Sequence, residues 1–222
     1  MIDGIRLKIC GLTALVDAEF VDRAGADALG FILYPKSPRY ISLLQYKAMA
    51  PRLPGGRKRV AVMVEPSAAE LAEALETGFD CFQVHFDPAN VPVAMISRWS
   101  QAVGPKRLWL APKLPPGVDV SGELLRLADT FLIDTFHADG FGGTGRTGDW
   151  AGFSRQQAAH PEKTWILAGG LNPENITAAL AESGAKFVDV NSGVELTPGV
   201  KDHAKVRRFV VAIHRARTKA GN

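Results

Sequence analysis

Short apolar runs rich in β-branched and aromatic residues recur along the chain, and stretches with helical spacing separate them. Strict alternation of strands and helices is typical of a parallel sheet. We expect eight strands, at Ile5–Ile9, Ala28–Leu33, Arg59–Val64, Asp80–His85, Arg107–Ala111, Thr130–Asp134, Thr164–Ala168 and Lys186–Val190. Eight such units close into a single-domain α/β fold, the (β/α)8 or TIM barrel, and residues 1–222 have the length of one such domain.

Capping residues mark several of the helices that this fold requires. Ser67 precedes an amphipathic stretch and has Glu70 three residues later, which is the pattern of a capping box. Gly78 and Gly184 stand at the expected helix C-caps. We expect helices at Ala14–Ala24, Leu43–Ala50, Ala68–Thr77, Ser121–Ala128 and Asn172–Glu182, of which the second and fourth are short.

Composition narrows the class of protein further. Hydrophobic residues make up 46% and charged residues 22% of the 222, which excludes disorder as the main state. No apolar run reaches the roughly 20 residues that span a bilayer, and residues 1–8 lack the pattern of a secretory signal, so we expect a cytoplasmic protein without a membrane partner. The net charge of +3 is too small to indicate nucleic-acid binding, and two cysteines do not make a disulfide framework.

Polar side chains gather at the carboxyl ends of the predicted strands. Period-2 alternation places Cys10 on the inward face of the first strand and His85 on the inward face of the fourth. Asp134 ends the sixth strand, and Asp189 lies on the inward face of the eighth. Each residue alone has a structural explanation, as a buried thiol or a helix cap, but four at one rim favour an active site. We interpret the other cysteine, Cys81, as a packing residue.

Glycine-rich segments follow the last three predicted strands. Barrels frequently bind phosphate with the loops after strands seven and eight, where backbone N–H groups can approach an anion closely. Tight turns are the alternative explanation. We favour a phosphate site and expect it to include Gly143, Gly169, Gly170, Asn191, Ser192 and Gly193.

Two local matches to nucleotide-binding motifs lack the context that their function requires. Gly143, Gly145 and Gly148 have the spacing of the dinucleotide fingerprint, and residues 140–147 resemble a phosphate-binding P-loop. Both matches begin several residues after their strand instead of directly following it, and Arg146 occupies the lysine position of the P-loop. No spacing of histidine, cysteine or carboxylate residues suggests a metal site.

A series of segments in a fixed order resembles the phosphoribosylanthranilate isomerase family of tryptophan biosynthesis. The resemblance runs from residue 8 to residue 202 and is far more specific than any single motif. The matching segments are Lys8–Thr13, Gly30–Phe31 with Tyr34–Tyr40, Gln83–His85, Gly142–Gly145 with Asp149–Trp150, Leu167–Leu171 with Pro173–Asn175, Asp189–Glu195 and Pro198–Asp202.

The resemblance implies an Amadori rearrangement of a small-molecule phosphoribosyl substrate, with no metal or organic cofactor. Cys10 matches the family's general base and Asp134 its general acid. Arg39 matches the residue that holds the anthranilate carboxylate, while His85 and Asp189 match polar neighbours of the reacting sugar. Either a monomer or a homodimer is compatible with the sequence.

Three positions depart from the family pattern, and two other functions remain open. Phe86 replaces a glycine and is expected to reshape the pocket mouth, Gly148 replaces an aromatic residue, and Asn191 replaces a serine beside the phosphate loop. One alternative is the histidine-pathway isomerase, which performs the same rearrangement. The other is a barrel that binds phosphosugars without catalysis. The retained Cys10 and Asp134 argue against the second alternative.

Overall fold

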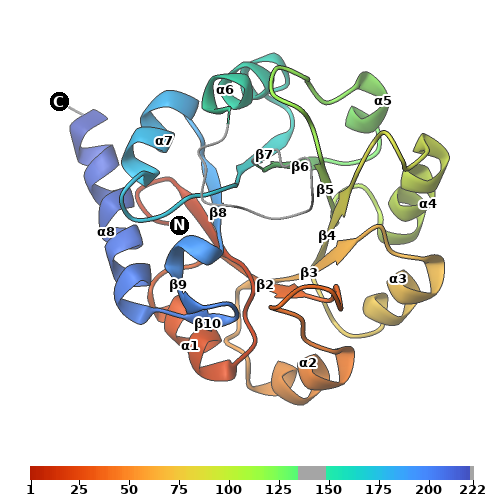
Figure 1. Ribbon diagram of the computed structural model, residues 1–222, viewed down its shortest axis with the longest axis horizontal. Coiled ribbons are helices and arrows are strands. Elements are labelled where there is room, and N and C mark those ends of the chain that lie inside the picture. The colour runs from red at the N-terminus through yellow and green to blue at the C-terminus, as the bar shows by residue number, and fades with distance from the viewer. Residues whose placement is uncertain (135–148, 221–222) are drawn as a thin grey trace.

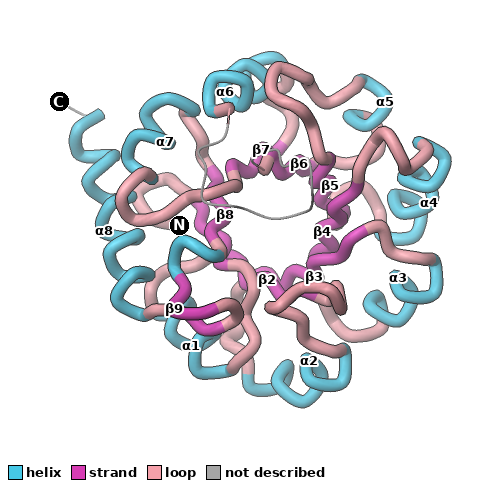
Figure 2. The backbone as a smooth tube through the Cα atoms, in the orientation of Figure 1, coloured by secondary structure: helices cyan, strands magenta, loops and turns pink. Residues whose placement is uncertain are grey.

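Eight parallel strands form a closed barrel in the order β1 to β8. The computed structural model describes residues 1–134 and 149–220, of which 217–220 are described by their backbone alone. The barrel is seen along its axis in Figures 1 and 2, with the strands as an inner ring. The strands are β1 Arg6–Ile9, β2 Ala28–Ile32, β3 Lys58–Val64, β4 Cys81–Phe86, β5 Leu108–Pro112, β6 Thr130–Ile133, β7 Thr164–Leu167 and β8 Phe187–Val190.

Helices surround this ring and cover its outer face (Figure 2). None of the helices in the described residues is long and apolar enough to cross a membrane. The helices are α1 Leu15–Arg23, α2 Leu43–Met49, α3 Ala68–Leu75, α4 Val93–Val103, α5 Gly122–Leu125, α6 Trp150–Ala159, α7 Ile176–Ser183 and α8 His203–Ala220, and a 3₁₀ turn at Ala50–Arg52 follows α2.

The predicted barrel is confirmed, and every predicted strand boundary lies within one residue of the observed one. The capping box of Ser67 and Glu70 is present, and Gly184 caps α7 in the left-handed conformation. Gly78, by contrast, is not a cap, because α3 already ends at Leu75 with Glu76 as its C-cap.

Two predicted helices are shorter than expected. The fifth, α5, covers only four residues within the predicted range Ser121–Ala128. The seventh begins at Ile176, four residues after the expected start at Asn172. Asn172 Oδ1 accepts hydrogen bonds from the backbone N–H groups of Glu174 and Asn175, so the asparagine closes a separate turn before the helix begins.

Alternation along the strands produces two apolar cores. Leu7 and Ile9 belong to the outer core, between the strands and the helices. Cys10 belongs to the inner core, which fills the barrel together with residues such as Trp109 and Leu132. Cys81 also lies in this inner core, in line with its interpretation as a packing residue.

An antiparallel hairpin that we did not predict follows β8. A 3₁₀ turn at Ser192–Val194 leads into β9 Glu195–Thr197, which pairs with β10 Val200–Lys201. The backbone N–H of Lys201 donates to Asp17 of α1, and the hydroxyl of Thr13 donates to the carbonyl oxygen of Gly199. The hairpin is therefore fixed against the start of the chain beside the barrel mouth (Figure 1).

Candidate active site

A pocket of about 130 Å³ opens where the strands end at their carboxyl termini. This is the end of a (β/α)8 barrel at which active sites lie. Of the eleven residues that we predicted for the site, nine line this pocket: Cys10, Arg39, His85, Asp134, Gly169, Gly170, Asp189, Asn191 and Ser192. Gly193 does not line it, and Gly143 lies outside the described residues.

Cys10 lies above a buried ion pair at the floor of the pocket. Lys8, two residues earlier on β1, has no exposed surface, and its Nζ is 2.8 Å from Oδ2 of Asp189. Burial raises the pKa of the Cys10 thiol, and the charge of Asp189 adds to this effect. The positive charges of Lys8 and Lys201 oppose it, but the pKa of Cys10 remains above its ordinary value.

Gly30 on β2 provides the space that this arrangement needs. A Cβ atom at Gly30 would lie 2.9 Å from Sγ of Cys10 and 3.0 Å from Cε of Lys8. Contacts of a Cβ atom are rarely as short as these two. A third atom, the main-chain Cα of Cys10, would also lie only 3.0 Å away, and it cannot move aside as a side chain can. A side chain at this position would therefore displace the thiol or the amine.

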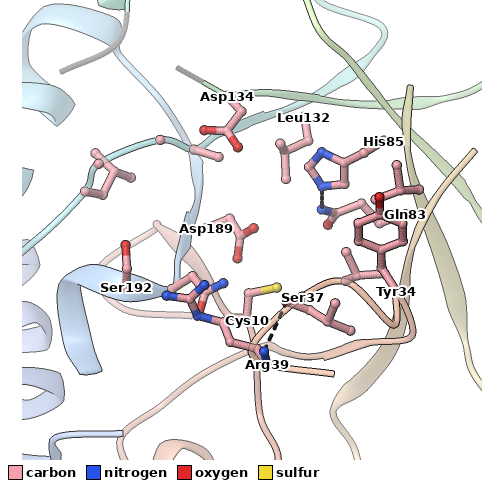
Figure 3. Close-up of a pocket in the computed structure, with 18 residues that line it drawn as sticks. Cys10, Tyr34, Ser37, Arg39, Gln83, His85, Leu132, Asp134, Asp189 and Ser192 are labelled. Atoms are coloured by element: carbon pink, nitrogen blue, oxygen red, sulfur yellow. Dashed lines mark hydrogen bonds between the residues drawn. The ribbon is translucent and has the colours of Figure 1, made fainter. Parts of the chain in front are cut away.

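His85 enters the pocket from β4 as a neutral ring. Burial, assisted by the charge of Lys8, lowers the pKa of His85 to about 4. Nε2 of His85 lies 2.7 Å from Nε2 of Gln83 (Figure 3). Because an amide nitrogen only donates, the histidine Nε2 accepts, and the neutral ring carries its proton on Nδ1. We did not single out Gln83 from the sequence, although its inward position on β4 follows from the same alternation.

Asp134 is the first residue after β6 and faces Cys10 across the pocket (Figure 3). Asp189 lies between them in this view, next to Cys10. Two acceptor atoms of the pocket, Oδ1 of Asp189 and Oε1 of Gln83, are buried and have no hydrogen-bond partner within the described part of the chain. Buried acceptors of this kind are suited to the hydroxyl groups of a ligand.

Arg39 reaches the pocket from the loop after β2, and one edge of its guanidinium is already bound. Its Nε lies 2.9 and 3.0 Å from the two carboxylate oxygens of Glu195, and its Nη2 lies 2.8 Å from Oε2. We did not predict this pair, because the two residues are 156 positions apart in the chain. A ligand carboxylate can therefore meet only the edge that carries Nη1.

The loops after β7 and β8 form the side of the pocket at which we expected phosphate. Gly169 and Gly170 both have positive φ, at 88° and 61°, a conformation that suits glycine. The side chain of Asn175 holds this turn by donating to the carbonyl oxygen of Gly170. Gly193 stays a predicted phosphate residue, and it also has a packing role. A Cβ atom there would lie 2.0 Å from the carbonyl oxygen of Leu171, so this glycine allows the two loops to touch.

Two departures from the family pattern can be placed in the structure. The expectation that Phe86 reshapes the mouth is wrong, because its side chain belongs to the outer core and contacts Trp99 of α4 edge-on, with ring centres 5.9 Å apart. Asn191 does line the pocket, and its Oδ1 accepts a hydrogen bond from Lys201. Gly148 lies outside the described residues.

The chain is similar to known proteins over almost its whole length. A family model described as N-(5'phosphoribosyl)anthranilate (PRA) isomerase matches residues 7–212. The N-(5'-phosphoribosyl)anthranilate isomerase of Neisseria gonorrhoeae is 36% identical over 215 residues, covering 95% of this chain and 97% of the relative.

Solved structures with the same fold point to the same family. The phosphoribosyl anthranilate isomerase of Thermotoga maritima has a TM-score of 0.74 and 33% identity, covering 96% of this chain and 99% of that one. A second isomerase structure, in complex with reduced 1-(o-carboxyphenylamino)-1-deoxyribulose 5-phosphate, has a TM-score of 0.69 and 32% identity, covering 93% and 96%. The chain therefore belongs to the N-(5'-phosphoribosyl)anthranilate isomerase family.

Proposed function

We propose that the protein converts N-(5'-phosphoribosyl)anthranilate into 1-(2-carboxyphenylamino)-1-deoxyribulose 5-phosphate, as a cytoplasmic enzyme of the tryptophan branch. The observation that carries this proposal is the placement of a thiol and a carboxyl group, Cys10 and Asp134, on opposite sides of one pocket. An aldose–ketose rearrangement needs an acid and a base that act on different atoms of the same sugar. Residues 1–222 would act as one catalytic domain.

Asp134 is the group that we assign to ring opening. Its carboxylic acid donates a proton to the furanose ring oxygen, and the bond between that oxygen and C1 breaks. The electrons of the anilino nitrogen form the C1=N bond of a protonated Schiff base. The hydroxyl on C4 is the product of this proton transfer, and Asp134 is left as a carboxylate.

Cys10 is the group that we assign to the second step. Its thiolate takes the proton from C2, and the C–H electrons form a C1=C2 double bond while the nitrogen becomes neutral. The enaminol then gives the ketone, as the C2 hydroxyl loses its proton and C1 gains one. Because the pKa of Cys10 is raised, the thiolate is the minor form at neutral pH, and the charge of Lys8 increases its share.

The two charged ends of the substrate would be held by different groups of the pocket. Gly169, Gly170, Asn191 and Ser192 line the side suited to the 5'-phosphate, where glycine backbone N–H groups can approach an anion. Arg39 would meet the anthranilate carboxylate with its Nη1 edge. The ribose hydroxyls would donate to the buried acceptors of Asp189 and Gln83.

A steady-state assay with the purified protein tests this function. The anthranilate fluorescence of the substrate reports its consumption, and chromatography identifies the product. We expect turnover of the phosphoribosyl anthranilate. Turnover restricted to the histidine-pathway aldose would support the other Amadori isomerase, and binding of the product analogue without turnover of either sugar would support a phosphosugar-binding barrel.

A further inference from the structure

Behind the pocket wall, the buried side chains of Glu195 and Lys201 form an ion pair that no step of the proposed mechanism uses. We infer that Glu195 and Lys201 are positioning residues, which fix the edge of Arg39 that faces the substrate and connect Arg39 to the phosphate side of the pocket through Asn191. The inference rests on the proposed function, because it assigns Arg39 an anionic ligand. It adds two residues of the β9–β10 hairpin to the binding machinery, although neither lines the pocket.

The contacts form a continuous path. Arg39 donates to both carboxylate oxygens of Glu195, whose side chain is only 4% exposed. Lys201, whose side chain has no exposed surface, donates to Oε1 of the same carboxylate at 2.9 Å. The amine also donates to Oδ1 of Asn191 at 3.0 Å. One buried carboxylate thus holds two cations, and the second cation holds a pocket residue.

Gly11 brings the two ends of this path together at the pocket wall. A Cβ atom at Gly11 would lie 2.6 Å from Oδ1 of Asn191 and 2.9 Å from Cδ of Arg39. The side chains of Arg39 and Asn191 therefore both lie against the same glycine. A change in the position of either side chain would affect the other.

The net charge explains why Arg39 is accompanied by both Glu195 and Lys201. Glu195 alone would cancel the charge of Arg39 and weaken its attraction for an anion. Lys201 restores a net charge of +1, which suits a substrate that carries a carboxylate and a phosphate. Burial by itself raises the pKa of Glu195, but the bonds from Arg39 and the charge of Lys201 outweigh it and hold that pKa below its ordinary value.

The hairpin has other attachments that a neutral residue at position 195 would leave intact. Lys201 donates through its backbone to Asp17, and Thr13 donates to Gly199. Lys205 donates to the backbone carbonyl oxygen of Glu195. A glutamine at position 195 still offers Oε1 as an acceptor to Gly199 and Lys201. We therefore expect Glu195→Gln to fold and to loosen mainly Arg39.

Calorimetric titration with two ligands tests the inference. One ligand is reduced 1-(o-carboxyphenylamino)-1-deoxyribulose 5-phosphate, and the other is the same compound without the ring carboxylate. We expect Glu195→Gln to weaken binding of the first ligand about tenfold, and binding of the second by less than about twofold. Lys201→Met should weaken both ligands to a similar extent, because it also releases Asn191. Arg208→Met, which removes a positive charge from an exposed position of α8, is the matched control and should change neither.

Each result decides between a positioning role and a merely structural one. Equal losses for both ligands in Glu195→Gln, or no loss for either, would overturn the inference. If the wild-type protein binds both ligands with equal affinity, Arg39 does not recognise the carboxylate, and the inference also fails. The proposed function is tested separately by turnover in the same preparation, so a binding result cannot be mistaken for a catalytic one.

Discussion

Lys8 and Asp189 form an ion pair inside the barrel, with Nζ 2.8 Å from Oδ2. The two residues face each other on neighbouring strands, because the β1–β8 register places Lys8 opposite Asp189. Burial opposes the charge of Lys8, but Asp189 and the Cys10 thiol outweigh it and raise the pKa of the amine. The same positive charge lowers the pKa of His85 and opposes the rise in the pKa of Cys10. Lys8 therefore influences three pocket residues without lining the pocket.

Lys8→Met should raise the pKa of the Cys10 thiol further. A nearby positive charge stabilises the thiolate, so its removal leaves less thiolate at any pH below the thiol pKa. The rate of alkylation by iodoacetamide should then rise only at higher pH than in the protein with Lys8. The measurement uses a Cys81→Ala background, in which Cys10 is the only cysteine.

Lys58→Met is the control for that experiment. Lys58 begins β3 at the opposite end of the barrel and lowers the pKa of Cys81 instead of that of Cys10. Its removal should leave the pH profile of Cys10 unchanged. If Lys8→Met folds and also leaves the profile unchanged, the electrostatic role of Lys8 is wrong.

Asp134→Asn should impair ring opening while substrate binding is largely kept. Asparagine has the same shape but no transferable proton, so kcat should fall by about 10²–10⁴-fold with little change in KM. A substrate that already carries the open-chain imine should bypass part of the defect. Asp129 directly precedes β6, at the end of the strand opposite to Asp134. Asp129→Asn is therefore the control and should retain full activity. A rise in KM with unchanged kcat would make Asp134 a binding group.

Phe86→Leu should affect stability and leave catalysis unchanged. The ring is buried against Trp99 in the outer core, and leucine fills most but not all of its volume. We expect the free energy of unfolding to fall by about 1 kcal/mol in a denaturant titration. The kcat and KM values should stay at the wild-type level. A changed KM with unchanged stability would instead indicate that Phe86 shapes the pocket mouth.

The sequence was sufficient for those features that depend on local pattern. Period-2 alternation located the strands and placed Cys10, His85 and Asp189 inside the barrel, because a strand that slips by one residue would bury the wrong face. The same reasoning was weaker for helices. At Asn172 a capping asparagine closed a turn instead of opening the helix, and the two alternatives have the same sequence signal.

Contacts between distant segments could not be predicted in this way. Glu195 meets Arg39 across 156 positions, and Lys8 meets Asp189 across 181. No periodicity links such pairs, since they depend on how the barrel closes and where the hairpin folds back. The packing role of Gly193 could not be predicted for the same reason, because its contact with Leu171 arises from the approach of two separate loops.

The two cysteines offer the most direct test of the account, because the same substitution can be made at each end of the barrel interior. Cys10 lines the pocket, whereas Cys81 lies in the inner core at the start of β4, where burial raises its pKa to about 11. The measurement is kcat for phosphoribosylanthranilate isomerisation by Cys10→Ala and Cys81→Ala, each with its folding verified by circular dichroism. We predict a loss of at least about 10²-fold for Cys10→Ala and near-wild-type turnover for Cys81→Ala. Near-wild-type turnover by a folded Cys10→Ala protein would contradict the assignment of Cys10 as the base.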